Sequence, residues 1–210
     1  MADHYEEEAQ VEQLKRWWSE NWKSLAAGLI LGLVVILGWE GYKRHNLQQA
    51  EQASQLYDDL KAALDAHKSD EAIVLGDKLV KEFSGTPYAS SAALHLAQLA
   101  AQQNKLNDAA LRLQWVSEHS KDAGLRDLAK LRLARVLWQQ KKLDEALKLT
   151  DGDHAGYTAL FTELRGDIKL SQGDRAAARS AYEQALQTSE GPNRQLLQQK
   201  LDDLADAVHS

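Results

Sequence analysis

Cysteine is absent from this chain of 210 residues. Its absence excludes a disulfide framework, a thiolate metal site and a cysteine nucleophile. Proline is nearly absent too, with two in the whole chain, and after position 45 the commonest residues are Ala, Leu, Gln, Glu, Lys and Asp. Because these residues favour the α-helix, the composition predicts a mostly helical protein.

An excess of positive charge is also missing, since the formal net charge is −6. This argues against a nucleic-acid partner, because contacts to phosphates need a basic face. Residues 1–23 carry three Lys/Arg and six Asp/Glu, a net charge of −3, whereas residues 43–210 carry 22 and 24, a net charge of −2. The large segment is therefore almost neutral, which is typical of a solvated helical surface.

Motifs of catalysis are lacking as well. The seven His are scattered, no two of them are spaced i, i+4, and the chain has neither a phosphate-binding loop nor a G-x-S-x-G motif. The acid–His cluster "DGDH" at 151–154 falls between two expected hairpins, where a turn with helix-capping acids is the better interpretation than a metal site. We expect no enzyme activity, no metal, no cofactor and no small-molecule substrate.

The longest uncharged run is "SLAAGLILGLVVILGW" at 24–39. Sixteen helical residues rise about 24 Å, slightly less than the roughly 30 Å hydrocarbon core. Aromatic residues, which favour membrane interfaces, flank the run, and counting from Trp22 to Tyr42 gives 21 residues. The run has no polar stripe, which argues against an amphipathic helix of a soluble core. The acidic start and the lack of a small-x-small cleavage site argue against a signal peptide. We predict an uncleaved single-pass anchor at 24–42.

The charges beside this anchor favour one orientation only slightly. Lys15, Arg16 and Lys23 precede it, and Lys43 and Arg44 follow it. By the positive-inside rule, three basic residues on the N-terminal side against two on the C-terminal side weakly favour a cytoplasmic N-terminus.

Small residues Ser24, Gly28 and Gly32 recur every four positions within the anchor. Such a face allows close approach of another membrane helix, so these residues are candidates for membrane-helix packing. The alternative is that glycine is simply common in membrane helices.

An amphipathic helix is predicted in the N-terminal segment, 1–23. Its apolar residues are spaced by three and four: Val11, Leu14, Trp17, Trp18 and Trp22. The pattern indicates either an interfacial helix with a solvated acidic tail or a docking site for a soluble partner.

The segment 43–210 repeats itself. "AALHLAQLAAQQNKLNDAALRLQWV" from Ala92 aligns with "AKLRLARVLWQQKKLDEALKLTD" from Ala129, and "LRGDIKLSQGDRAAARSAYEQAL" from Leu164 follows the same pattern. Alanines of the second helices fall at 72, 109, 146 and 178, separated by 37, 37 and 32 residues. These spacings straddle the 34-residue tetratricopeptide period.

Small residues at the slots of Ala97, Ala134 and Gly166 let the two helices of each hairpin cross closely. Four hairpins are expected to stack. In "NRQLLQQKLDDLADAV" one apolar stripe predicts a C-terminal capping helix, formed by Leu196, Leu197, Leu201, Leu204, Ala205 and Val208. The predicted fold is all-α: a single N-terminal transmembrane helix followed by a tetratricopeptide-like α-solenoid with a capping helix.

In such arrays the first helix of each hairpin lines a concave groove. We expect Glu163 and Asp167 there, and the candidate partner-binding residues are Leu94, Gln98, Leu131, Arg135, Trp138 and Leu170. Trp and Arg are enriched at interface hot spots. Burial against neighbouring helices is the preferred interpretation for Leu131 and an equal alternative for Trp138. The mixed polarity suits a polypeptide segment.

The order of these parts resembles one family. "LKRWWSENWK" leads into an anchor, "FSGTPYASSAALHLAQLAAQQNKLNDAALRLQWV" and "LRGDIKLSQGDRAAARSAYEQAL" follow, and "QLLQQKLDDL" ends the chain. Taken together these segments look like the YfgM family, ancillary subunits of the SecYEG translocon. The resemblance covers essentially the whole chain.

The resemblance implies a place in the bacterial inner membrane, with residues 1–23 in the cytoplasm and the repeat domain, 43–210, in the periplasm. It implies association with the SecYEG translocon and the periplasmic chaperone PpiD, and a role in passing emerging client polypeptides to chaperones. It also links the cytosolic tail to the response regulator of an envelope-stress phosphorelay. Three hypotheses follow: a non-catalytic translocon adaptor, a regulator acting through its tail, and a scaffold for assembly of an envelope complex.

Overall fold

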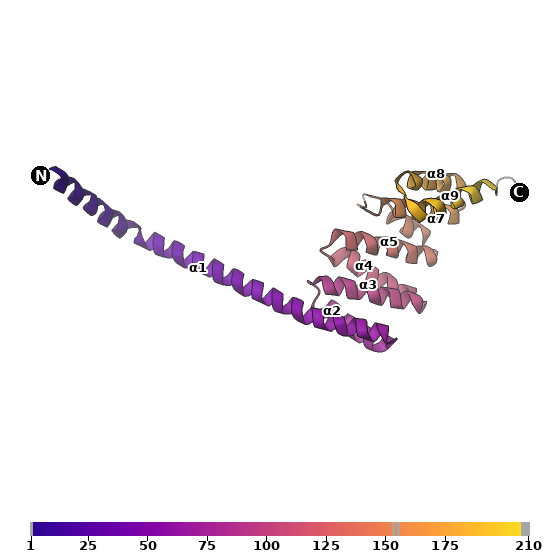
Figure 1. Ribbon diagram of the computed structural model, residues 1–210, viewed down its shortest axis with the longest axis horizontal. Helices are drawn as coiled ribbons and strands as arrows, with labels where there is room; N and C mark the ends of the chain where they lie inside the picture. The colour runs from indigo at the N-terminus through magenta and orange to yellow at the C-terminus, as the bar shows by residue number, and fades with distance from the viewer. Residues whose placement is uncertain (1, 153, 155, 207–210) are drawn as a thin grey trace. The chain divides into compact units, whose positions relative to one another are not determined.

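The computed structural model describes the backbone of residues 2–152, 154 and 156–206 (Figure 1). In these residues all regular secondary structure is α-helix, which confirms the all-α prediction. The helices are α1 (Ala2–Asp65), α2 (Ser69–Glu82), α3 (Pro87–Gln102), α4 (Leu106–His119), α5 (Ala123–Gln139), α6 (Leu143–Lys148), α7 (Thr158–Ser171), α8 (Arg175–Thr188) and α9 (Gly191–Asp206).

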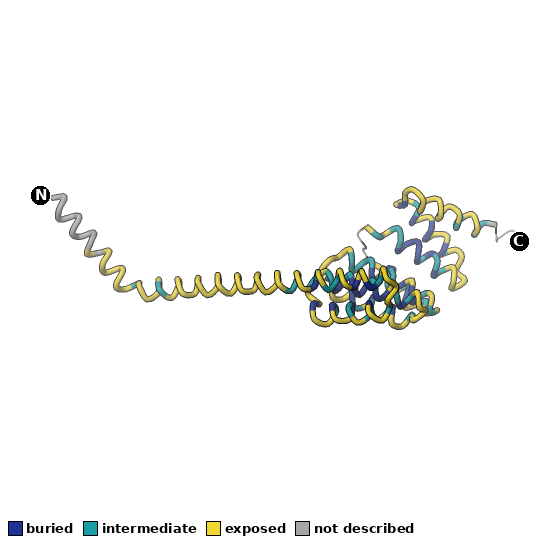
Figure 2. The backbone as a smooth tube through the Cα atoms, turned by 60° about the horizontal axis from the view of Figure 1, so that its bottom comes forward, coloured by how far each residue is buried: buried dark blue, intermediate teal, exposed yellow. Residues whose placement is uncertain are grey.

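The chain divides into two units, residues 1–49 and 50–210. In the first unit the large apolar side chains of α1 from Leu14 to Leu47 are exposed, in keeping with the exposed colouring of this part in Figure 2. An 18-residue window of α1 has a mean hydropathy of 1.8 and is 0% buried. A helix that is apolar all round and has no protein around it needs an apolar surrounding. This part of α1 therefore has the length, composition and exposure of the predicted membrane-spanning helix.

The second unit is a stack of four helix hairpins. The end of α1 pairs with α2, α3 with α4, α5 with α6, and α7 with α8, and α9 follows the last hairpin. The buried side chains form three clusters: one from α1 to α3, one from α3 to α7, and one between α8 and α9. Each hairpin thus buries its apolar face against its neighbours, as expected of a solenoid.

Close helix crossings occur at the predicted small residues. Ala134 is 0% exposed and Ala97 is 2% exposed. At Gly166 an added Cβ would overlap the ring of Tyr182 from α8. The second-helix alanines, 72, 109, 146 and 178, are all 0% exposed. A larger side chain at any of these slots would push two helices apart.

Each hairpin turns through a residue with left-handed backbone conformation. The φ values are 57° at His67, 58° at Asn104, 63° at Lys141 and 85° at Gly173. The next residue donates its N–H to the carbonyl five positions earlier, as from Lys105 to Ala100 at 2.8 Å. This Schellman arrangement ends each first helix and satisfies its last carbonyls.

The capping helix α9 buries Leu197, at 0% exposure, and Leu204, at 6%. Leu201 is half-buried, so the stripe follows the helical spacing of four and three residues. Leu196 was expected in the same stripe, but it is 44% exposed because it lies about 100° around the helix from Leu197. Val208 lies outside the described residues.

The segment between α6 and α7 is irregular. Its predicted turn is present, but the predicted capping is wrong for Asp151, because the N-cap of α7 is Tyr157 and no side chain accepts a bond there. Instead, Thr150 is 0% exposed and its carbonyl accepts a bond of 2.6 Å from Arg165. His154 is 4% exposed and stacks on Phe161, with ring centroids 3.5 Å apart. Asp153 lies outside the described residues.

Replacing Lys141 with Gly should stabilise the solenoid by about 1 kcal/mol. A side chain in the left-handed region costs roughly 1–2 kcal/mol, part of which the greater chain entropy of Gly offsets. The measurement is the urea midpoint of the detergent-solubilised protein. Lys78→Gly is the control, since Lys78 is exposed in the middle of α2 and has a helical backbone. That control should destabilise, and an equal response of both variants would contradict the strain assigned to Lys141.

Candidate partner-binding groove

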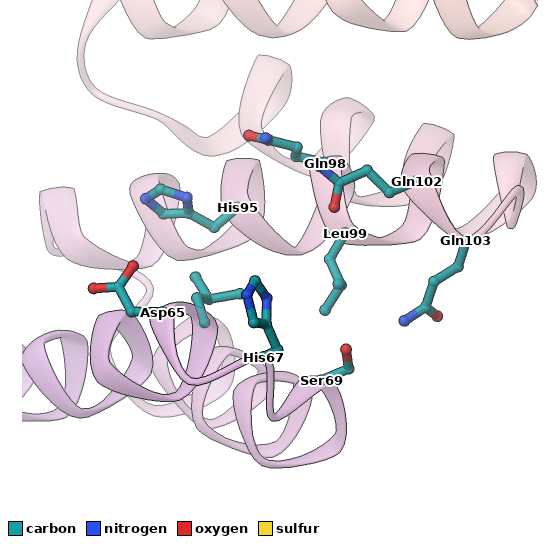
Figure 3. A pocket seen from close by; sticks show the side chains of 9 residues that line it. Asp65, His67, Ser69, His95, Gln98, Leu99, Gln102 and Gln103 are labelled. Atoms are coloured by element: carbon teal, nitrogen blue, oxygen red, sulfur yellow. The ribbon is translucent and has the colours of Figure 1, made fainter.

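The first helices of successive hairpins leave crevices between them on one side of the stack. The crevice between the end of α1 and α3 has a volume of about 410 Å³. Asp65 and His67 come from the end of α1 and its following turn, whereas His95, Gln98 and Gln102 project from α3 (Figure 3). Its walls are therefore mainly polar.

His95 joins the two walls of this α1/α3 crevice. The hydroxyl of Tyr57 lies 3.0 Å from His95 Nε2. Burial, together with the positive charges of Arg132 and Lys61, lowers the pKa of His95. The imidazole is thus kept neutral, and its role here is to hold α3 against α1.

The next crevice, between α3 and α5, has a volume of about 380 Å³. Its floor is apolar and its rim carries two guanidinium groups and an amide. The lining residues are Leu94, Ala97, Gln98, Ala101, Leu113, Arg132, Arg135 and Val136. An apolar floor with a few polar groups at the edge is the usual form of a ligand-binding site.

The crevice between α7 and α9 is occupied by a lysine of the chain itself. Lys200 Nζ donates to Glu163 Oε1 at 2.7 Å and to Asp167 Oδ1 and Oδ2 at 2.7 and 3.0 Å. The hydroxyl of Tyr182 donates to Asp167 Oδ1 at 2.8 Å. These charge-assisted bonds tie the capping helix to α7 and α8.

The pKa values in this network follow from its geometry. Burial lowers the pKa of Lys200, but the hydrogen bonds and charges of Asp167 and Glu163 raise it by more, so the net change is upward from 10.5. Burial raises the pKa of Tyr182, and the bond to Asp167 adds to this effect. The ammonium and the phenol both keep their protons at neutral pH.

The predicted partner-binding residues lie in several places. Leu94, Gln98 and Arg135 come together in the α3/α5 crevice. Leu170 is 39% exposed and lines the α7/α9 crevice. Leu131 is 1% exposed, which leaves no surface for a partner.

Trp138 bridges two first helices. Its side chain is half-buried, and its indole N–H donates to the hydroxyl of Ser171 on α7 at 2.8 Å. One edge of the ring thus supports the packing of α5 on α7, while the rest stays partly open to a partner.

Arg132 and Lys200 were not predicted from the sequence as residues of these crevices. Arg132 lies one helical turn before Arg135 and lines the same crevice. Lys200 pairs with Glu163 and Asp167, which were expected to line an open groove. The spacing of three from Arg135 could have indicated Arg132, whereas Lys200 gave no signal because the register of α9 against α7 depends on tertiary packing.

The small residues of the anchor lie on one exposed face of α1. Ser24, Gly28 and Gly32 are all exposed, and a Cβ added at either glycine would meet nothing within 4 Å. The face is therefore open to a second membrane helix. In the described part of the chain, no group of three or more His, Cys, Asp or Glu is placed to hold a metal ion.

These features define a class of protein: a repeat solenoid of helix hairpins joined to a membrane-spanning helix. The family model described as "Tetratricopeptide repeat-like domain" matches residues 15–206. The match confirms the tetratricopeptide-like solenoid predicted from the repeats.

Curated relatives narrow the class. A protein of Escherichia coli K12 named "Ancillary SecYEG translocon subunit" is 36% identical over 98% of this chain and all of its own length. Proteins of the same name from Haemophilus influenzae and Neisseria gonorrhoeae are 33% and 32% identical, each over 97% of this chain and all of their own length. The chain belongs to this family of ancillary translocon subunits, which confirms the resemblance to YfgM.

Replacing Lys200 with Met should lower the free energy of unfolding by about 1–3 kcal/mol at neutral pH, because two carboxylates lose their charged donor. Since the folded pKa of Lys200 is raised, its contribution is complete below 10.5 and is lost as the pH rises through the folded value. We therefore expect wild type and variant to converge in strong alkali. Urea titrations from pH 7 to 11.5 measure this.

Lys61→Met serves as the control for that titration. The Lys61 ammonium pairs with Asp58 at 2.8 Å, but its side chain is 50% exposed. We expect a small effect at every pH, because exposed ion pairs contribute little. A Lys200→Met variant as stable as this control would contradict the role given to the network.

Proposed function

We propose that this protein is a non-catalytic, membrane-anchored adaptor of the SecYEG translocon. In this proposal residues 24–42 cross the bacterial inner membrane, 1–23 lie in the cytoplasm and 43–210 lie in the periplasm. The observation that carries the proposal is the full-length similarity to proteins named ancillary SecYEG translocon subunits. The exposed apolar helix supports the membrane anchor, and the crevices of the solenoid support a binding role.

The repeat domain is proposed to bind protein partners along its crevices. The partner would be the periplasmic chaperone PpiD or an emerging client polypeptide. Leu94, Gln98 and Arg135 would contact it in the α3/α5 crevice, with Trp138 and Leu170 further along the first helices. Repeat solenoids use extended surfaces of this kind for protein recognition.

The decisive experiment is purification of the full-length protein from membranes in mild detergent, with mass spectrometry of the proteins that accompany it. Translocon subunits together with a periplasmic chaperone would support the proposal. A cytosolic response regulator in their place would support the regulatory alternative, and envelope assembly factors would support the scaffold. Deletion of residues 2–12 separates the first two, since it should spare chaperone binding and abolish regulation through the tail.

Trp138→Ala should weaken capture of the periplasmic partner by about 1–3 kcal/mol, the usual loss at an interface tryptophan. Quantitative pull-down with the purified partner measures it, after circular dichroism has shown that the variant is folded. Trp115→Ala is the control, because Trp115 is also half-buried but lies on α4, the second helix of its hairpin. Unchanged capture by the folded Trp138 variant would remove this residue from the proposed surface.

Gly32→Leu should weaken association with a partner membrane helix by about 1 kcal/mol, because the larger side chain prevents close approach. Co-purification of translocon subunits from membranes measures the effect. Gly38→Leu introduces the same side chain at another exposed glycine, outside the i, i+4 series. If both variants retain every membrane partner, the small-residue face is not the contact.

A further inference from the structure

Four equivalent junctions join the first helices of the stack and the capping helix. The small-residue slots at Ala97, Ala134 and Gly166 set the register between α3, α5 and α7. The residue two before the slot, facing the preceding helix, is His95, Arg132 or Leu164. This residue faces two positions on the preceding helix: the residue three before the small-residue slot of that helix and the residue directly after the slot. For Arg132 on α5 these are Leu94 and Gln98 on α3.

Lys200 holds the same position on α9. The α7/α9 crevice and the α3/α5 crevice are lined by residues in matching register: Asp167 with Gln98, Leu170 with Ala101, Tyr182 with Leu113, Lys200 with Arg132, and Leu204 with Val136. The four junctions can therefore be compared position by position.

In three junctions the residue at the first facing position, three before the slot, matches chemically. His95 lies 3.0 Å from the hydroxyl of Tyr57. Leu164 and Leu131 are both apolar and buried, at 2% and 1% exposure. The second position that faces Leu164 is Arg135, which lines the α3/α5 crevice. Lys200 is bonded to two carboxylates.

The fourth junction, at Arg132, is mismatched. Arg132 faces Leu94 and Gln98 on α3, which stand at the repeat positions that Glu163 and Asp167 occupy on α7. Among the described residues no carboxylate lies within 4.0 Å of the guanidinium of Arg132 or of Arg135. The charge of Arg132 is felt as far as His95, whose pKa it lowers. The α3/α5 crevice thus has cations at its rim, an apolar floor and no carboxylate among its lining residues.

We propose that the α3/α5 crevice binds an acidic polypeptide segment of a partner, in which an Asp or Glu pairs with Arg132 and a neighbouring apolar side chain fills the floor. The carboxylate would supply in trans what Glu163 and Asp167 supply to Lys200 within the chain. Arg135, one turn further along α5 on the same rim, would receive a second carboxylate. A guanidinium suits this role because it binds a carboxylate through two parallel hydrogen bonds.

The shape of the crevice favours a peptide over a small anion. The floor consists of aliphatic side chains from α3, α4 and α5, and the volume of about 380 Å³ exceeds the need of a lone carboxylate. Burying an apolar side chain beside the ion pair excludes water from it, which strengthens the pair. The inference rests on the proposed partner-binding function of the repeat domain and names the chemistry of the segment bound.

The test uses the full-length protein in lipid nanodiscs and a display library of random dodecapeptides. Selection should enrich peptides with Asp or Glu within four residues of a large apolar residue. Fluorescence anisotropy with an enriched peptide, and with its Asn/Gln version, then gives the affinities. We expect the neutral version to bind about 10- to 100-fold more weakly, on the scale of a desolvated charge pair.

Variants of the protein locate the site. Arg132→Gln should lose about the same factor for the acidic peptide and none for the neutral one. Gln98→Asp should also weaken binding, because it places a carboxylate at the position of Asp167 and gives Arg132 a partner within the chain. Arg179→Gln is the control with the same charge change, since this arginine lies on α8 with a side chain 61% exposed.

The outcomes are distinct from those of the co-purification experiment. Three results would overturn this inference: no enriched peptide, enrichment of basic peptides, or equal binding by Arg132→Gln and wild type. If translocon subunits still co-purify, the adaptor proposal stands. Enrichment of acidic peptides that Arg132→Gln no longer binds would support the inference. Loss of translocon association with intact peptide binding would overturn the adaptor proposal alone.

Discussion

The close crossing of paired helices at alanine and glycine is the constraint on which the repeat domain depends. Within the last hairpin, the ring of Tyr182 occupies the space that a Cβ at Gly166 would need; between the first two hairpins, a Cβ added at Gly76 on α2 would lie 2.5 Å from Leu96 Cδ1 on α3. Alanines at the equivalent slots are fully buried. Because interiors are close-packed, this short spacing fixes the distance between the helices of a hairpin and the angle at which the next hairpin stacks.

A repeated backbone frame leaves the side chains between hairpins free to differ. The turns share one left-handed residue each, at 67, 104, 141 and 173, and polar contacts join successive repeats at matching places. Gln140 donates to Asn107 at 3.0 Å, and Gln172 donates to Asp144 at 3.0 Å. Between successive first helices the same frame carries a hydrogen bond, a cationic crevice, an apolar contact and an ion network. Binding chemistry can therefore change from one crevice to the next without a change of fold.

The membrane helix obeys a different constraint. Its apolar side chains have no protein neighbours, so its stability as a helix comes from satisfied backbone bonds and an apolar surrounding. The repeat domain, by contrast, is held by burial between its own hairpins. The two parts use apolar residues in opposite ways: one presents them outward all round, and the other turns them inward at helical spacing.

The sequence by itself determined the elements and their repetition. Sixteen uncharged residues between aromatic flanks, after an acidic start, favour the anchor over a buried helix or a signal peptide, and alanines every 32 to 37 residues predict stacked hairpins. It also placed Leu94, Gln98 and Arg135 on one face, because residues in matching repeat positions share a face.

Only the tertiary structure decided which predicted groove residues are open. Leu131, Leu94 and Glu163 share one register and are all buried, at 1%, 8% and 8% exposure, but Leu94 still lines the α3/α5 crevice. The carboxylates of Glu163 and Asp167 are paired with Lys200, which is more than 30 residues away in the sequence. The position of Lys200 depends on how α9 packs against α7 and α8. Local pattern sets which face a residue occupies, whereas the neighbour across the crevice sets whether its charge is neutralised, and that neighbour is chosen by packing between distant segments.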